Sequence, residues 1–346
     1  MHGLRMSSMG PPRSIRYLAP TMRRIALALL VLIVLLALCA ALLARPLSPR
    51  DLGSHPRPVA SHDEAVRLVD SLRAADTPAI APECGTELLT HGARTARVLV
   101  LLHGLTNCPA QFDSLGRCAY AQGANVLIPR IPHHGFGDRM TTELARLEAR
   151  ELCAFTDRVL DAAHGLGDSV TVAGLSIGGV MAAWAGQERA DVARAVAIAP
   201  MLGWARAPGP TWTAVLARSA MLLPNFFIWW NDELEQDLPG PRHVYPRFAT
   251  RSVAASMLVG AAVRADARHA RPACRSLVMI TVGGDVAVDN SAAADLVRTW
   301  RAGGASEVLA YEFSPALHLN HDVVDPEQVG ANPGITYPVL LGFFAP

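Results

Sequence analysis

The stretch that decides the fold is Ser169-Val-Thr-Val-Ala-Gly174-Leu-Ser176-Ile-Gly178-Gly179, which continues into the apolar, alanine-rich residues 180–186. The β-branched run favours a strand, and the alanine-rich run favours a helix. The pattern predicts a strand, a sharp turn at Ser176 and a helix, an arrangement known as a nucleophile elbow. At such a turn the serine hydroxyl is exposed at a helix N-terminus, where the N–H of Ile177 can stabilise negative charge on a substrate carbonyl oxygen.

Strands and helices are predicted to alternate on both sides of the elbow. Such alternation indicates an α/β fold with a mainly parallel sheet that helices cover on both faces. Apolar or β-branched runs predict strands at residues 87–92, 97–102, 124–129, 193–198, 276–282 and 307–313. Amphipathic patterns predict helices at residues 62–75, 110–122, 142–164 and 291–301.

The alternation breaks over residues 201–271, which contain four of the six tryptophans. We expect this insertion to form a cap over the carboxyl edge of the sheet. Residues 222–230 within it are more apolar than a small cap needs for its own core. They either pack the cap onto the sheet, line an acyl pocket or touch a bilayer.

Residues 25–44 are twenty consecutive uncharged residues, which is enough to cross a bilayer as a helix. Arginines at positions 5, 13, 16, 23 and 24 precede them, so the positive-inside rule predicts a cytoplasmic N-terminus. We expect a single-pass anchor with the body outside the cytoplasm, which corresponds to the periplasmic side of a bacterial inner membrane. A cleaved signal peptide is the alternative, although the apolar core is long for one and no clear Ala-x-Ala site follows it.

Length and composition limit the classes of protein to which the chain can belong. Its 346 residues, 51% of them apolar, supply the core of a large α/β domain. All 31 basic residues are arginine, and the body beyond residue 45 is mildly acidic, without a basic stripe for nucleic acid. The predicted segments are a basic cytoplasmic segment (1–24), an anchor (25–44), a linker and extension (45–84, with the linker at 46–58) and the main domain (85–346).

Neither the cysteines nor the paired histidines predict a metal site. Five cysteines lie beyond the anchor, their spacing matches no metal motif, and an odd number leaves at least one unpaired. Which of them pair stays open at this point. His133 and His134 lack a spaced third ligand, so we expect structural hydrogen bonding from them. No metal or cofactor is predicted.

A serine nucleophile needs a base and an acid that orients the base, and in this type of fold they follow in the order Ser, acid, His. Asp285 comes shortly after the strand that ends at Val282, where the acid is expected. Asp289 is the alternative, but it stands just before a predicted helix, where capping explains it.

Two histidines three residues apart are candidates for the base. His321 lies about eight residues beyond the strand that ends at Phe313, far enough for its loop to reach the elbow. It precedes Asp325-Pro326, which resembles a helix start. His318 is the alternative base, and we expect it to pack within the loop instead.

With these residues in place, the chain resembles the α/β-hydrolase superfamily, and within it the capped carboxylesterases and monoacylglycerol-lipase-like enzymes. The resemblance covers about residues 85–345 and implies Ser176 as nucleophile, His321 as base and Asp285 as its partner. It also implies an oxyanion hole made by the backbone N–H groups of Leu105 and Ile177. The motifs that carry it are Leu101-Leu-His-Gly-Leu-Thr-Asn107, the elbow, Gly284-Asp285 and His321-Asp322. The loop Pro132-His133-His134-Gly135 lacks the Arg-Gly that often precedes the histidine in lipase-like members.

The sequence therefore predicts a membrane-anchored serine hydrolase that cleaves carboxylic esters, with an apolar small-molecule ester as substrate. A serine peptidase or an acyltransferase of the same fold begins with the same acyl-enzyme, so both remain alternatives. A third alternative is a catalytically silent binding module, which a full set of triad residues in the right order argues against. A serine at the elbow also argues against the dehalogenases and epoxide hydrolases of this fold, whose nucleophile is an aspartate.

Overall fold

The computed structural model describes residues 13–45, 47, 51–77 and 79–345. The chain divides into two compact units, Met1–Arg45 and Pro46–Pro346. The first contains helix α1 (Arg13–Leu43), in which Met22–Leu43 have a mean hydropathy of 3.3 and none is buried against protein. This helix is long and apolar enough to span a membrane, and a signal sequence can have the same length and composition. Of the predicted basic segment 1–24, residues 1–12 lie outside the described residues.

A single sheet of seven strands forms the centre of the second unit, within the residues that the structure describes. Neighbouring strands are parallel, except that β1 runs antiparallel to β3. β1 and β2 do not pair with each other, because β3 lies between them. In spatial order the strands are β1 (Glu87–Leu89), β3 (Asn125–Ile128), β2 (Thr95–Leu102), β4 (Gly167–Leu175), β5 (Arg194–Ile198), β8 (Ser276–Val282) and β9 (Glu307–Phe313).

Helices cover both faces of the sheet, which explains why its inner strands are apolar on both sides. In β2, Val98 and Val100 pack in one core and Leu99 and Leu101 in another, as the twofold alternation of a strand requires. The first core includes α4 (Ala149–Leu166), α5 (Ile177–Glu188) and α8 (Asn290–Ala302), with α2 (His62–Arg73) packed on α4. The second includes α3 (Ala110–Ala121) and α9 (Pro333–Phe344).

Two of the predicted helices differ from the structure. The helix expected at residues 142–164 is divided into a short 3-10 helix, Glu143–Arg146, and α4. The backbone is extended at Leu147 and Glu148, which lets Leu147 reach the core. No helix begins at Asp325-Pro326, because the Asp325 side chain and backbone are engaged in loop hydrogen bonds.

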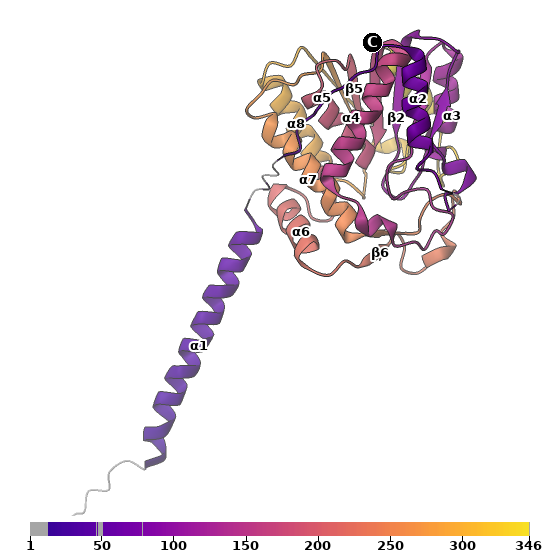
Figure 1. The fold of residues 1–346 in the computed structure, drawn as a ribbon. Coiled ribbons are helices and arrows are strands. Elements are labelled where there is room, and N and C mark those ends of the chain that lie inside the picture. The colour runs from indigo at the N-terminus through magenta and orange to yellow at the C-terminus, as the bar shows by residue number, and fades with distance from the viewer. Residues whose placement is uncertain (1–12, 46, 48–50, 78, 346) are drawn as a thin grey trace, which may run out of the picture. The chain divides into compact units, whose positions relative to one another are not determined.

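The insertion predicted to form the cap, residues 201–271, lies between β5 and β8. It contains α6 (Pro210–Leu222) and a two-stranded antiparallel sheet of β6 (Phe227–Trp229) and β7 (Arg247–Ala249), and Figure 1 shows α6 and β6 together at one end of the domain. α7 (Thr250–Asp266), which falls inside the predicted cap of residues 201–271, packs against α5 in the main core and also against α6 of the cap. α7 therefore connects the cap to the layer of helices that covers the sheet.

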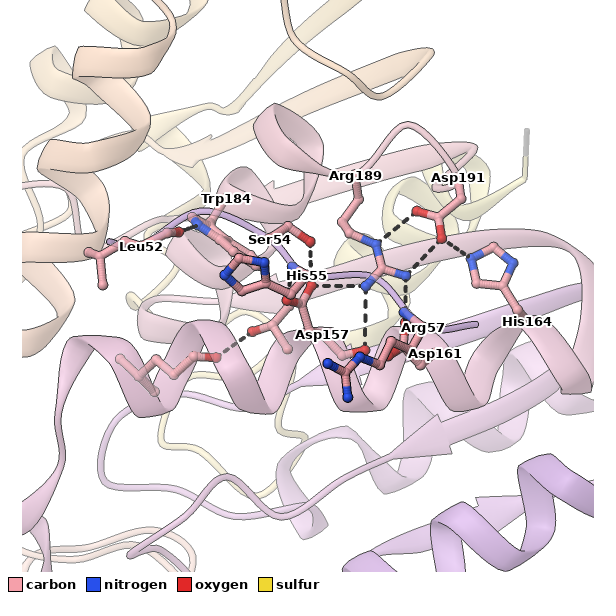
Figure 2. A network of polar contacts seen from close by, with 12 residues as sticks. Leu52, Ser54, His55, Arg57, Asp157, Asp161, His164, Trp184, Arg189 and Asp191 are labelled. Atoms are coloured by element: carbon pink, nitrogen blue, oxygen red, sulfur yellow. Dashed lines mark hydrogen bonds and ion pairs between the residues drawn. The ribbon is translucent and has the colours of Figure 1, made fainter. Parts of the chain in front are cut away.

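The segment interpreted as a linker at 46–58 is bound to the domain over its described part. Residues 51–59, called the strap below, run along α4 and α5 (Figure 2). Residues 46 and 48–50 lie outside the described residues. The bonds that hold the strap include Trp184 Nε1 to Leu52 O (2.7 Å), Ser54 Oγ to Asp157 Oδ1 (2.5 Å), Arg57 N to Asp161 Oδ1 (2.9 Å) and Val59 N to Asp161 O (3.1 Å).

Candidate active site

Ser176 stands at the turn between β4 and α5 with φ 58° and ψ −111°. A Cβ at Gly174 would overlap the backbone of Gly178, and a Cβ at Gly178 would overlap the Leu102 carbonyl, so both positions require glycine. The turn is held because the Ser176 N–H donates to the Ile198 carbonyl at 2.9 Å. The glycine pattern that predicted the elbow therefore reflects close backbone approach between neighbouring elements.

The loop after β8 and the loop after β9 bring Asp285 and His321 together. The Nδ1 atom of His321 lies 2.7 Å from the Asp285 carboxylate, whose side chain is fully buried. Burial alone raises the pKa of Asp285, but hydrogen bonds from His321 and from the N–H groups of Ala287 and Val288 outweigh it and lower the pKa. An ionised Asp285 accepts a hydrogen bond from the Nδ1–H of His321, which leaves Nε2 unprotonated and available as a base.

The two alternative residues lie elsewhere. Asp289 caps α8 by accepting the Ser291 N–H at 3.0 Å, and its other oxygen accepts the Gly209 N–H at 2.8 Å. His318 is exposed, in a left-handed conformation at the end of a short 3-10 helix. The structure brings neither into the pair.

Ser176 and His321 line one cavity of about 730 Å³, together with Leu105 and Ile177. Among the described residues, none forms a hydrogen bond with the Ser176 hydroxyl; such bonds often tighten only when substrate binds. Most of the lining is apolar, and the cap contributes a large part of it. The cap side chains include Leu216, Leu223, Phe226, Ile228, Trp230 and Phe248.

The two N–H groups expected to form the oxyanion hole are both unengaged. Ile177 is the first residue of α5, so its N–H has no acceptor within the helix. Leu105 is buried in the loop after β2, and no described residue accepts a hydrogen bond from its N–H. Both groups belong to residues that line the cavity beside Ser176.

His103 holds the loop that carries Leu105. Its Nε2 accepts the Ile131 N–H at 3.0 Å, so its Nδ1 carries the proton and donates to the Gly104 carbonyl at 3.0 Å. Burial lowers the pKa of His103 well below its usual value, which keeps the ring neutral and able to make both bonds. The motif histidine thus has a structural role.

Gln111, which sequence reasoning missed, connects this loop to the loop of His321. Its side-chain oxygen accepts the Gly104 N–H at 2.7 Å, and its nitrogen donates to Asp322 at 2.6 Å. The other Asp322 oxygen accepts the N–H groups of Val324 and Asp325. Nothing in the sequence distinguishes Gln111 from a surface glutamine, because its role depends on a residue 211 positions away.

A disulfide anchors the same loop at its far end. Cys84 and Cys108 are bonded, with their Cα atoms 5.2 Å apart. Cys108 directly follows Asn107, whose side chain accepts the Cys108 N–H at 2.9 Å. Among the other cysteines, Cys153 is buried as expected for a small core residue.

The paired histidines form hydrogen bonds, as the sequence predicted. His133 lies between Glu151 and Glu143, and these hydrogen bonds raise its pKa although partial burial opposes them. His134 is buried and bonds to the Pro132 carbonyl, and burial lowers its pKa to about 4. Over residues 13–345, as far as they are described, no group of three or more potential metal ligands is found.

Comparisons with known proteins agree with this architecture. A family model described as the alpha/beta hydrolase family matches residues 99–329. No curated protein sequence matches the chain. Similar solved structures include one reported for the metagenome-derived lipolytic enzymes LipS and LipT, which has 18% identity and a TM-score of 0.55 over 77% of this chain and 98% of that one. A monoacylglycerol lipase from Paleococcus ferrophilus has 13% identity and a TM-score of 0.55, with 75% and 97% covered. A soluble variant of the Saccharomyces cerevisiae monoglyceride lipase has 13% identity and a TM-score of 0.54, with 75% and 91% covered.

Proposed function

This chain belongs to the alpha/beta hydrolase family, and we propose that it is a serine hydrolase that cleaves carboxylic esters through an acyl-enzyme intermediate. The observation that carries the proposal is the shared cavity. Ser176, at a strained turn, and His321, bonded to the buried Asp285, line the same apolar space. The fold shared with lipolytic enzymes supports the same chemistry.

In the proposed mechanism His321 removes the proton from the Ser176 hydroxyl as its oxygen attacks the ester carbonyl carbon. The carbonyl oxygen becomes negatively charged and accepts hydrogen bonds from the N–H groups of Leu105 and Ile177. His321 then protonates the leaving alcohol, and the acyl group stays on Ser176. Water, deprotonated by His321, attacks the acyl carbon, the bond from that carbon to the Ser176 oxygen breaks, and His321 returns the proton to Ser176 as the acid leaves. Asp285 stabilises the imidazolium in both halves.

The cavity supports an ester with an apolar acyl chain as substrate. Its volume is within the usual range for a small-molecule site, and the cap covers it with aliphatic and aromatic side chains. Part of the apolar stretch 222–230 serves this purpose, since Leu223, Phe226 and Trp230 line the cavity. A panel of esters of increasing acyl length measures how much of this space the acyl chain uses.

We also propose that residues 25–44 anchor the protein in a membrane with its catalytic domain on the extracytoplasmic side. The arginines that precede the span support this orientation. The Cys84–Cys108 disulfide supports it as well, because disulfides persist in oxidising compartments such as the periplasm.

Labelling with a fluorophosphonate probe and a Ser176→Ala variant test the mechanism. We expect the wild-type protein to be labelled at Ser176, and Ser176→Ala to lose labelling together with about 10³-fold or more of kcat. Ser71→Ala, at an exposed serine of α2, is the matched control and should keep both. Unchanged turnover by folded Ser176→Ala, or failure of the wild-type protein to react with the probe, would refute the mechanism.

A further inference from the structure

The cap returns to the main domain through residues 241–247, called the return segment below, and this segment is bonded to the loops after β2, β3 and β9. Its His243 ring lies 3.0 Å from Asp325 in the loop of His321. The Tyr245 hydroxyl accepts the Phe136 N–H at 2.7 Å in the loop after β3. The cap is therefore attached by polar contacts and is more than an apolar cover.

Two hydrogen bonds attach the cap to Thr106, the residue after Leu105. The Thr106 carbonyl accepts the Tyr245 N–H at 2.8 Å, and the Thr106 hydroxyl accepts the indole N–H of Trp230 at 3.0 Å. Trp230 also packs on Phe248, with ring centroids 4.6 Å apart. Thr106 is 6% exposed and Trp230 is 45% exposed, so the bond between their side chains is partly buried.

The two sides of Leu105 are supported by different parts of the molecule. Gly104, before it, is held by the main domain, through His103 and Gln111. Thr106, after it, has hydrogen-bond partners only in the cap, as far as the described residues go. The Gly104 carbonyl, which shares a peptide plane with the Leu105 N–H, also accepts the Asn107 N–H at 3.2 Å. The main domain therefore closes the turn that carries Leu105, and the cap holds the corner of that turn at Thr106.

We propose that Thr106 is a positioning residue through which the seated cap orients the Leu105 N–H toward the oxyanion. The proposal rests on the proposed function, because it assigns the Leu105 N–H to the oxyanion hole. The hydrogen bonds at Thr106 matter most when the carbonyl oxygen is charged, since a misdirected donor costs more against an anion than against a neutral carbonyl. Loosening Thr106 therefore lowers kcat while substrate binding in the apolar cavity is retained.

Thr106→Val removes the hydroxyl acceptor of the side-chain bond and keeps the shape of the residue. Trp230→Phe removes the indole N–H donor and keeps an aromatic ring. We expect each to lower kcat about tenfold. KM should change less than about twofold in Thr106→Val, whereas Trp230→Phe also changes the lining of the cavity. The double variant should lose no more than either single one, because both remove the same bond. Thr106→Ser keeps the hydroxyl and should restore most of kcat.

The control is Trp212→Phe, at an exposed tryptophan of the cap that does not line the cavity. It should match the wild-type protein, and thermal unfolding of every variant checks that each is folded. The inhibition constant of a boronic acid that mimics the tetrahedral intermediate should rise in proportion to the loss of kcat/KM.

The outcomes separate this inference from the proposed function. A wild-type protein that hydrolyses no ester of the panel refutes the proposed function and the inference with it. If the wild-type protein is active, a change in KM alone, independent losses in the double variant, or full activity of Thr106→Val would each refute only the role of Thr106. A Thr106→Ser variant as slow as Thr106→Val would also contradict the role of the hydroxyl.

Discussion

Ser176 has a strained backbone conformation, and hydrogen bonds from its N–H and to its carbonyl hold it in place. A non-glycine residue at φ 58° and ψ −111° costs about 1–3 kcal/mol, so the surrounding structure has to stabilise it. The Ser176 N–H is bonded to Ile198, and its carbonyl accepts the N–H groups of Val180 and Met201. The strain is thus held by β5 and α5, and it keeps the hydroxyl exposed to the cavity.

Single substitutions of His321 and His318 test which histidine is the base. We expect His321→Ala to lose nearly as much kcat as Ser176→Ala, with little further loss in the double variant, because triad members act as a unit. His318→Ala is the matched control and should keep most of the activity, since His318 is exposed and outside the pair with Asp285. Steady-state kinetics on folded variants measure both, and the reverse pattern would assign the base to His318.

Among the larger elements, the strap and the pair α4–α5 are joined by a buried arginine. The Arg189 side chain is 0% exposed and contacts Asp157, Asp161 and Asp191 at 2.7–2.9 Å (Figure 2). The same Asp157 and Asp161 carboxylates accept hydrogen bonds from the strap. Burial raises the pKa of Asp191, but hydrogen bonds from His164 and Arg189 outweigh it and hold the pKa far below its usual value.

Replacing Arg189 by methionine should therefore destabilise the domain. Because the variant leaves buried carboxylates without their cation, we expect the free energy of unfolding at neutral pH to fall by about 3–5 kcal/mol. Arg158→Met, on the exposed side of α4, is the control and should change it by less than about 0.5 kcal/mol. Denaturant unfolding measures both.

The pH dependence of the same variant follows from the lowered pKa of Asp191. A carboxylate with a depressed folded-state pKa stabilises the fold above its unfolded pKa of about 3.9, and this contribution is lost as the pH falls through the folded value. The difference between wild type and Arg189→Met should thus shrink in strong acid. A difference that grew on acidification would contradict this account of the cluster.

For the molecule as a whole, the prediction concerns the apolar helix α1, proposed here as a membrane anchor. We expect the full chain to remain with membranes after washing with high salt, and protease added from the extracytoplasmic side to digest the domain. A variant without residues 1–45 should be soluble, since the second unit has its own core. Recovery of the full gene product as a soluble, shortened protein would show that the apolar segment is a cleaved signal.

Local pattern was enough to predict most elements. The strands at 276–282 and 307–313 have the predicted bounds. In the first, the apolar run reflects burial on both faces of the strand, whereas the second is a largely exposed edge strand. The elbow was predictable because close backbone contacts require its glycines, Gly174 against Gly178 and Gly178 against Leu102, and leave a recognisable spacing in the sequence. Asp289 was recognisable as a helix cap for the same reason, since its partner is two residues away.

What only the tertiary structure decided concerns residues distant in the chain. The insertion of β3 between β1 and β2, the Cys84–Cys108 pair, and α7 as part of the main core all depend on which apolar faces meet. Trp230 and Thr106 are 124 positions apart, and each looks like an ordinary residue of its own segment. A sequence pattern shows which side of an element is apolar, but the partner of a polar group is chosen by the packing that brings the carboxyl edge of the sheet and the cap together.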